Sequence, residues 1–175
     1  YAIERYGTQE ARDRWLPMLA TGRALCAFCL TESDAGSNTN AIQTIARRHA
    51  DGWRLEGDKY LVDSASWASV FVVFARTRSE ATGAWATSAF VVPRSAPGIR
   101  IGDEQLTLGL RGMVQTTVDF KDVPLSEEAL LGEVGAGARV AQAALAIARL
   151  NIAAKSIGGA KRCLQLLARF ARRRN

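Results

Sequence analysis

The sequence predicts an α+β fold in which an antiparallel β-barrel or sandwich forms the middle of the chain and helical segments flank it. Three observations support this prediction. Residues 24–132 contain apolar runs of strand length that are separated by turn residues. Before this region Thr8 has the character of a helix N-cap. After it, apolar residues recur with a helical spacing. We therefore divide the 175 residues into a helical segment (1–23), a central β-domain (24–132) and a second helical segment (133–175).

The first helix is predicted from Gln9 to Leu16. Thr8 precedes it and suits an N-cap, because its hydroxyl oxygen can accept a hydrogen bond from a free backbone N–H group. Pro17 and Gly22 are expected to close the helix, since proline cannot donate to the helical ladder and glycine readily leaves it.

The strands of the middle region follow one another between turn signals. Asp51-Gly52 separates two of them, and both residues tolerate positive φ, so we expect a two-residue hairpin there. Pro97-Gly98 marks a further turn. The expected strands are residues 24–30, 43–50, 53–62, 69–75, 87–92 and 116–120.

The last segment has apolar residues at steps of three, four or seven from about Gly137 onward. A helix of this length extends about 60 Å at about 1.5 Å per residue, which exceeds a compact domain of this size. Either Gly158-Gly159 bends the helix, or it belongs to a bundle whose other helices lie outside this chain. We prefer the bundle, because the chain begins at Tyr1 without a start methionine or a signal peptide and we expect it to be a piece of a longer protein.

The formal net charge of +6 is concentrated near the C-terminus. Residues 137–175 contain nine basic residues and no acidic residue, whereas residues 1–136 contain 14 basic and 17 acidic residues. Such a segment could bind RNA, an anionic membrane or a phosphate-rich cofactor, and a solvated helix face is the alternative. No reader motif with interleaved aromatic residues is present, so we expect no nucleic-acid partner.

The three cysteines are an odd number and fit a reducing compartment, either the cytoplasm or an organelle matrix. Cys26 and Cys29 form a C-x-x-C pair, but a period of two sends them to opposite faces of a strand and no second ligand pair accompanies them. We therefore expect structural thiols and no metal. We also expect no membrane span, because no run reaches about 18 uncharged apolar residues.

The most informative stretch ends a predicted strand with Leu30-Thr31-Glu32 and continues through Ala35-Gly36-Ser37. It offers backbone N–H groups and two hydroxyl groups at the end of a sheet, which suits a polar ligand edge, although a plain Asx or Ser turn is the commoner explanation of such residues.

This stretch resembles the signature of the acyl-CoA dehydrogenase family, and six further resemblances follow the order of that family. The matching segments are Thr8 to Gly22, Asp51 to Lys59, Phe74-Ala75-Arg76-Thr77, Pro97-Gly98-Ile99, Leu108 to Gly112, and Phe120 to Pro124 with Leu131-Gly132-Glu133. The resemblance implies that 1–23 ends an N-terminal helical domain, 24–132 is the central β-domain, and 133–175 starts a C-terminal helical domain.

The resemblance implies an FAD-dependent oxidoreductase that converts an acyl-CoA thioester to the trans-2-enoyl thioester. In that family a carboxylate base removes the α proton while the β hydrogen leaves as hydride to the flavin. It further implies an electron-transfer flavoprotein or a similar acceptor, a homo-oligomer and a cytoplasmic or matrix location. The matching cofactor-binding residues are Phe28, Leu30, Thr31, Gly36, Ser37, Leu61, Val62, Asp63 and Arg174, and the matching substrate-binding residues are Ser37 and Arg149.

The match departs from the family pattern in four places. The usual aromatic-Ile-Thr/Ser segment beside the flavin is Leu61-Val62-Asp63, and an ionised Asp63 would lower the flavin potential. Ala146 replaces an acidic residue that often precedes Arg149 by three places. Ser33 and Asn38 replace a proline and an aspartate of the usual signature.

The fourth departure concerns the catalytic base, which is a glutamate of the C-terminal domain in most members and in others precedes the matching arginine, where this chain has Ala148. The base therefore stays unknown. We expect Glu32, Asp34 and Asp63 to have structural roles, His49 to be an exposed strand residue, and the glycines at 132, 135 and 137 to form a loop and cap. The alternatives to a dehydrogenase fragment are a non-catalytic binding or assembly subunit and a variant that acts on carrier-protein-bound acyl groups.

Overall fold

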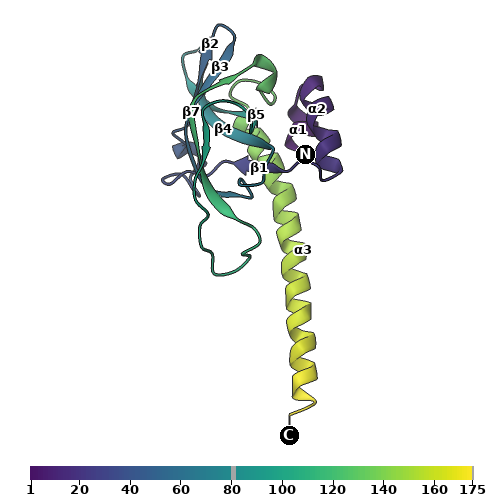
Figure 1. Ribbon diagram of the computed structural model, residues 1–175. Coiled ribbons are helices and arrows are strands. Elements are labelled where there is room, and N and C mark those ends of the chain that lie inside the picture. Colours follow the sequence, from purple (N-terminus) through teal and green to yellow (C-terminus); the bar gives the residue numbers. More distant parts are fainter. Residues whose placement is uncertain (80–81, 175) are drawn as a thin grey trace. The chain divides into compact units, whose positions relative to one another are not determined.

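The computed structural model describes residues 1–79 and 82–174. The chain separates into two compact units, Tyr1–Ala141 and Gln142–Asn175. The first unit contains two short helices and a curled sheet, and the second consists of the larger, C-terminal part of one long helix and the residues that follow it (Figure 1). The α+β class predicted from the sequence is confirmed.

Two helices open the first unit, α1 (Ala2–Tyr6) and α2 (Gln9–Ala20). The Thr8 hydroxyl accepts a hydrogen bond from the Ala11 N–H at 3.2 Å, as predicted for the N-cap. The predicted end at Pro17 is wrong, because α2 continues to Ala20 with Pro17 inside it. Pro17 lies in the last turn, where only the one bond that its missing N–H would make is lost. Thr21 is the C-cap residue after Ala20, and Gly22 follows with φ +69°.

The sheet contains seven strands, and the predicted strands all form within it. One further short strand, β6, was not expected from the sequence. The strands are β1 (Cys26–Cys29), β2 (Ile45–His49), β3 (Gly52–Asp63), β4 (Val70–Arg78), β5 (Trp85–Pro93), β6 (Ile99–Ile101) and β7 (Gln115–Leu125). Two 3-10 turns, η1 (Thr39–Ala41) and η2 (Glu127–Ala129), lie between them.

The sheet is mixed rather than wholly antiparallel. The order is β1-β4-β2-β3-β7-β6, with β5 on the other edge of β4. β4 runs parallel to β1, from the Cys26–Val70 pair to the Cys29–Val73 pair, and parallel to β2 at Ile45 and Arg76. Because β5 occupies one edge of β4 along its whole length, β1 and β2 follow each other along the opposite edge. The chain therefore leaves this edge after β1 and returns to it at β2.

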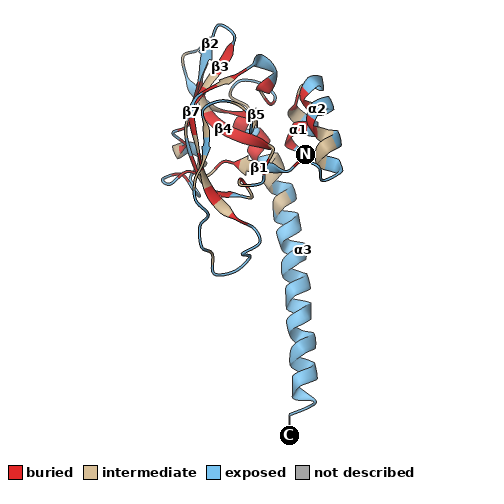
Figure 2. Cartoon of the chain, viewed as in Figure 1, coloured by how far each residue is buried: buried red, intermediate tan, exposed pale blue. Residues whose placement is uncertain are grey.

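The core lies on the inner face of the curled sheet, where the buried residues of β3, β4, β5 and β7 meet (Figure 2). Aromatic rings connect the strands, with Trp53 5.5 Å from Phe90 and Phe71 6.4 Å from Phe120 between ring centroids. Such edge-to-face pairs stabilise a core by about 0.5–1.5 kcal/mol beyond their buried area. This core gives the strand ends a rigid support.

The long helix α3 spans Gly137–Ala171 without interruption, so Gly158-Gly159 does not break it. From Ala146 to Arg174 nearly every residue is exposed, and Figure 2 shows this part of the helix in pale blue. Among the described residues, α3 is the one helix that is long and apolar enough to cross a membrane, judged by length and composition alone. One such helix is weak evidence, since core helices of soluble proteins share these properties.

Candidate functional site

The two segments that were predicted to border a flavin meet at the C-terminal end of β1. The Tyr60 N–H donates to the Thr31 carbonyl oxygen at 2.9 Å, although the two residues are far apart in the sequence. Leu30 and Thr31 therefore lie beside the end of β3, which carries Leu61, Val62 and Asp63. This part of the predicted site is assembled by the fold.

Residues 30–44, which we call the signature loop, fill the interval between β1 and β2 along the edge of β4. It begins with a tight turn, in which Glu32 and Ala35 exchange backbone hydrogen bonds of 3.1 and 3.2 Å. It ends where the Arg76 N–H of β4 donates to the Thr44 carbonyl oxygen at 2.7 Å. Both ends of the loop are thus fixed to the sheet.

A buried ion pair lies beneath this loop. Lys59 Nζ is 2.7 Å from Glu32 Oε1, and the two side chains are 0% and 6% exposed. Lys59 Nζ also donates to the Leu30 carbonyl oxygen at 3.2 Å. The Glu32 carboxylate accepts two backbone N–H groups from the end of the loop, Gln43 at 2.6 Å and Thr44 at 3.0 Å. One charged pair therefore joins β1, β3 and the start of β2.

The surroundings act on the protonation of Glu32 in opposite directions. Burial alone raises the pKa of a carboxyl group, but the hydrogen bonds from Lys59, Thr44 and Gln43 outweigh it and the pKa of Glu32 lies below its ordinary value. Because its oxygens are held by three donors, Glu32 is a structural group and is not a candidate base. The sequence-based prediction of a structural role is confirmed for Glu32.

A bulge in β3 decides which way residues 61–63 point. The register with β7 shifts between Lys59 and Val62, and Leu61 adopts φ +52°. As a result Val62 is buried at 2% exposure whereas Leu61 is 41% exposed. The Val62 side chain is part of the core, so of these three residues only Leu61 and Asp63 present side chains outside it.

Asp63 is held from the neighbouring strand. Gln115, its register partner on β7, donates from Nε2 to Asp63 Oδ1 at 2.8 Å. Gln115 is a neutral amide, so this contact brings no positive charge to the carboxylate of Asp63, which lies at the exposed end of β3 next to the apolar Leu61.

The remaining residues of the predicted site in this unit differ in their exposure. Phe28 is half-buried, with its ring 4.8 Å from that of Phe74, and Leu30 is buried. Gly36 and Ser37 lie in the exposed turn. A Cβ atom built on Gly36 meets nothing within 4 Å, so the chain itself does not require glycine there.

The two predicted arginines belong to the second unit. Arg149 is an exposed residue of α3, and Arg174 follows the helix, with its guanidinium carbon 5.9 Å from the centre of the Phe170 ring. Their roles toward substrate and cofactor stay predictions.

The minor motifs behave as structural elements. Cys26 is exposed and Cys29 is buried, as the opposite-face prediction requires, and burial raises the pKa of the Cys29 thiol far above its ordinary value. His49 is an exposed residue at the end of β2, 2.6 Å from the Asp51 carboxylate. Gly132 and Gly135 have positive φ in the loop before α3. Within residues 1–79 and 82–174, no group of three or more His, Cys, Asp or Glu residues is arranged to hold a metal ion.

Sequence reasoning missed Lys59 and Gln115 as parts of the site. A signal for Lys59 was available, because Trp53, Leu55, Gly57 and Lys59 share one face of a regular strand and the first two are plainly apolar. No sequence signal identifies Gln115, since its contact with Asp63 depends on the register of two distant strands.

Comparison with known proteins gives two family matches that together cover most of the chain. The profile of the acyl-CoA dehydrogenase middle domain matches residues 27–123, and that of the acyl-CoA dehydrogenase C-terminal domain matches residues 135–175. The short-chain specific acyl-CoA dehydrogenase of human mitochondria is 33% identical over 172 residues, which cover 98% of this chain and 42% of that protein.

Two solved structures have the same fold over nearly the whole chain. A glutaryl-coenzyme A dehydrogenase in complex with glutaryl-CoA has a TM-score of 0.92 and 31% identity, covering 100% of this chain and 44% of the other. An acyl-CoA dehydrogenase from Bacillus anthracis in complex with FAD has a TM-score of 0.91 and 32% identity, covering 99% and 29%. The chain thus spans less than half the length of the relatives that it matches.

Proposed function

Because the chain belongs to the acyl-CoA dehydrogenase family, we propose that the protein is an FAD-dependent oxidoreductase that dehydrogenates an acyl-CoA thioester between its α and β carbons. The observation that carries the proposal is the hydrogen bond between Tyr60 and Thr31, which brings both predicted flavin-bordering segments to one edge of the sheet. FAD, when bound, supplies the hydride acceptor, and the protein supplies orientation and hydrogen bonds.

The exposed edge has a chemistry that fits an isoalloxazine ring. Leu61 is an apolar side chain held out of the core by the bulge, and it offers a surface to one face of a planar ring. Thr31 and Ser37 bring hydroxyl groups from the neighbouring loop. The proposed cofactor-binding residues are Phe28, Leu30, Thr31, Gly36, Ser37, Leu61, Val62, Asp63 and Arg174, with Val62 contributing through its backbone.

On the substrate side, Ser37 is proposed to lie near the thioester and Arg149 near the CoA group. None of the three acids nearest the site is proposed as the base: Glu32 is fixed in its ion pair, Asp34 is a residue of the tight turn, and Asp63 is hydrogen-bonded to Gln115. We assign the catalytic base to a part of the protein outside residues 1–175.

The wider proposal follows the family. Residues 1–23 end an N-terminal helical domain, 24–132 form the central domain and 133–175 begin a C-terminal helical domain. An electron-transfer flavoprotein or a similar acceptor reoxidises the flavin, and the protein is a homo-oligomer of a reducing compartment, most simply the cytoplasm. The exposed apolar residues of α3, among them Leu150, Leu164 and Phe170, support a helical partner for this segment.

A flavin test on the purified full-length protein decides the proposal. We expect flavin absorbance bands and their bleaching when acyl-CoA is added without oxygen. Thr31→Val, which removes one hydroxyl at the edge, should weaken FAD binding, whereas Thr21→Val at the C-cap of α2 should not. A protein that stays colourless after reconstitution with FAD contradicts the proposal.

A second candidate is a non-catalytic binding or assembly subunit, favoured by the presence of the carboxylate of Asp63, held by Gln115, in the segment that is proposed to border the flavin. A relative that acts on carrier-protein-bound acyl groups is a further variant. Asp63→Asn keeps the shape and the contact with Gln115, and it should raise the flavin midpoint potential if the dehydrogenase proposal holds. Bleaching by an acyl-carrier protein but not by acyl-CoA would assign the carrier-bound substrate.

A further inference from the structure

The connection from β3 to β4 follows directly after the proposed flavin-bordering segment. Residues 64–68, which we call the β3–β4 turn, form a tight turn in which the Trp67 and Ala68 N–H groups donate to the Ser64 carbonyl oxygen at 3.1 and 3.0 Å. Ala65 and Ala68 are buried, at 0% and 1% exposure. The turn is therefore packed against the core, and it determines where the end of β3 lies.

The backbone on both sides of Asp63 is strained. Leu61 has φ +52° and Ser64 has φ +59°, a left-handed conformation that costs energy for residues other than glycine. Such residues persist only where the surrounding structure fixes them, and they cluster at functional sites. The Ser64 N–H is fixed from β7, because it donates to the Val114 carbonyl oxygen at 2.6 Å. The positions of Leu61 and Asp63 thus depend on what holds the β3–β4 turn in place.

Arg94 holds this turn from β5. It follows Pro93, the last residue of β5, and its own N–H donates to the Ser69 carbonyl oxygen at 3.0 Å. From this fixed base its side chain reaches the turn, where Nη1 donates to the carbonyl oxygens of Ala65 at 2.7 Å and Ala68 at 3.4 Å. Both hydrogen bonds are partly buried, although Arg94 is an exposed residue as a whole.

The charge of Arg94 is directed to these carbonyl groups. None of the ion pairs among the described residues includes Arg94. Backbone carbonyl groups of buried residues need hydrogen-bond partners, and hydrogen bonds from a charged donor are stronger than neutral ones. One guanidinium group therefore connects the end of β5 to the turn that ends the flavin-bordering segment.

We propose that Arg94 is a positioning residue for the dehydrogenation: by holding the carbonyl groups of the β3–β4 turn, it sets the positions of Leu61 and Asp63 at the flavin edge. The inference rests on the proposed function, since it requires FAD at this edge of the sheet. Arg94 acts through the turn and is not itself proposed to contact the flavin or the substrate.

Anaerobic rapid mixing of the full-length, FAD-loaded protein with acyl-CoA tests the positioning role. Arg94→Met keeps an unbranched apolar stem and removes every donor. We expect the rate of flavin reduction at saturating acyl-CoA to fall about ten- to a hundredfold, because a small displacement in an active site has an effect of this size. The acyl-CoA concentration that gives half of the maximal rate should stay near the wild-type value, since the turn is not proposed to bind the substrate.

The conservative variant Arg94→Lys should recover part of this rate. A single nitrogen, Nη1, makes both contacts with the turn, so an ammonium group can donate to the same carbonyl oxygens. The recovery should be incomplete, because lysine lacks the rigid planar group of arginine.

Amide hydrogen exchange of the flavin-free protein tests the hold on the turn without any flavin chemistry. In Arg94→Met the amides of Trp67 and Ala68 should exchange faster, because their hydrogen bonds lie within the turn that has lost its support. The amides of the β2–β3 hairpin should keep their wild-type rates.

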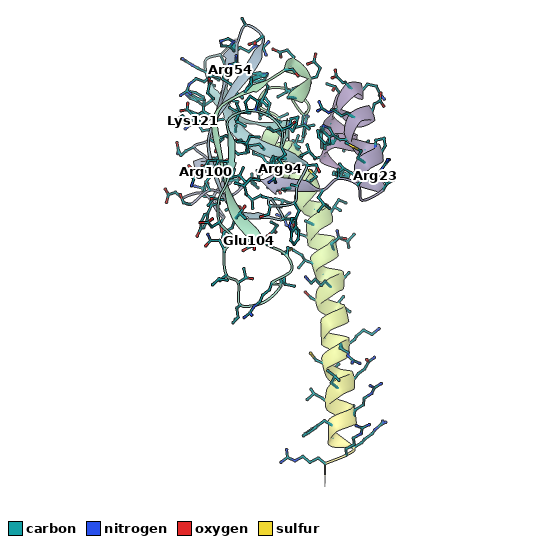
Figure 3. The ribbon with its side chains drawn as sticks, viewed as in Figure 1. Arg23, Arg54, Arg94, Arg100, Glu104 and Lys121 are labelled. Atoms are coloured by element: carbon teal, nitrogen blue, oxygen red, sulfur yellow. The ribbon has the colours of Figure 1, made fainter. Side chains whose placement is uncertain are left out.

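Arg100→Met is the matched control. Arg100 is an exposed arginine of β6, 3.9 Å from Asp119, and it lies apart from Arg94 in the side-chain view (Figure 3). This variant should change neither flavin reduction nor exchange in the β3–β4 turn. Thermal melting of every variant sets an assay temperature well below unfolding, so that a loss of stability is not mistaken for a loss of positioning.

Slower reduction at unchanged half-saturation, with faster exchange confined to the turn, supports the inference. It is overturned if Arg94→Met lowers the melting temperature but reduces its flavin at the wild-type rate, if exchange rises throughout the sheet, or if Arg94→Lys is as slow as Arg94→Met. A wild type that does not bind FAD contradicts the proposed function and the positioning role together. Normal flavin reduction in both the wild type and Arg94→Met contradicts the positioning role alone.

Discussion

Two ion pairs of the first unit have similar chemistry and opposite surroundings. Lys59 and Glu32 are 2.7 Å apart with side chains 0% and 6% exposed, whereas Arg47 and Glu56 are also 2.7 Å apart with side chains 59% and 60% exposed. The same distance therefore has different consequences. Water screens the exposed pair, but loss of one buried partner leaves a charge without compensation. The difference shows that burial, more than contact distance, decides which pair the fold depends on.

The largest expected effect is that of Lys59→Met, which has a similar length and no charge. Glu32 would stay buried without its cation, so the free energy of unfolding should fall by about 3–5 kcal/mol. Urea unfolding monitored by circular dichroism measures the change. A loss below about 1 kcal/mol would mean that water reaches Glu32 and that the pair is not buried in solution.

Combining Lys59→Met with Glu32→Gln should cost less than Lys59→Met alone. The amide oxygen of glutamine can still accept from Gln43 or Thr44 while the unpaired charge is gone, so we expect recovery of at least about 1 kcal/mol. The same unfolding experiment on the single and double variants gives the coupling free energy. Additive losses would show that the two side chains do not interact.

Acid should destabilise the buried pair through Glu32. Its pKa is below the ordinary value in the folded protein, so its contribution to stability is fully present above the pKa of the unfolded chain, about 4.3. This contribution is lost as pH falls through the lower folded-state pKa. Melting temperatures between pH 7 and pH 2.5 should therefore fall more steeply in the wild type than in Glu32→Gln. Parallel curves would assign the acid sensitivity to other carboxylates.

The smallest expected effect is that of Arg47→Gln. Its partner Glu56 stays hydrated, so the free energy of unfolding should change by less than about 0.5 kcal/mol, and the small difference should vanish in high salt. The measurement is the same urea titration at two salt concentrations. A loss comparable to that of Lys59→Met would remove the distinction between the two pairs.

The local sequence pattern predicted where the strands of this fold lie better than it predicted which strands pair with one another. The hairpin at Asp51-Gly52 and the strand around Val70 to Ala75 follow from turn chemistry and short-range apolar spacing. The parallel pairing of β1 with β4 does not, because it joins Cys26 to Val70 across a long stretch of chain. Nothing in the alternation of a buried strand specifies which neighbour it takes or in which direction.

The candidate site shows the same limit at single residues. A strict period of two from Trp53 places Lys59 and then Leu61 on the inner face, and Lys59 is indeed buried. The bulge reverses the phase after Lys59, so Val62 is buried in place of Leu61. Positive φ at a leucine is unusual and has no sequence marker, which is why the orientation of Leu61 and Asp63 could not be derived from spacing.

The shared edge of β4 also bears on how the chain folds. β2 and β3 are joined by a tight turn and can pair as soon as both have been synthesised, but β1 waits for β4, whose paired residues follow it by 44 positions. Closing such a loop costs entropy before any contact compensates for it. The signature loop connects β1 to β2, and its C-terminal end is hydrogen-bonded to β4 through Thr44 and Arg76. It can therefore reach its final shape only after β4 has docked. The segment with the most chemistry should therefore be among the last to become protected from amide hydrogen exchange during refolding.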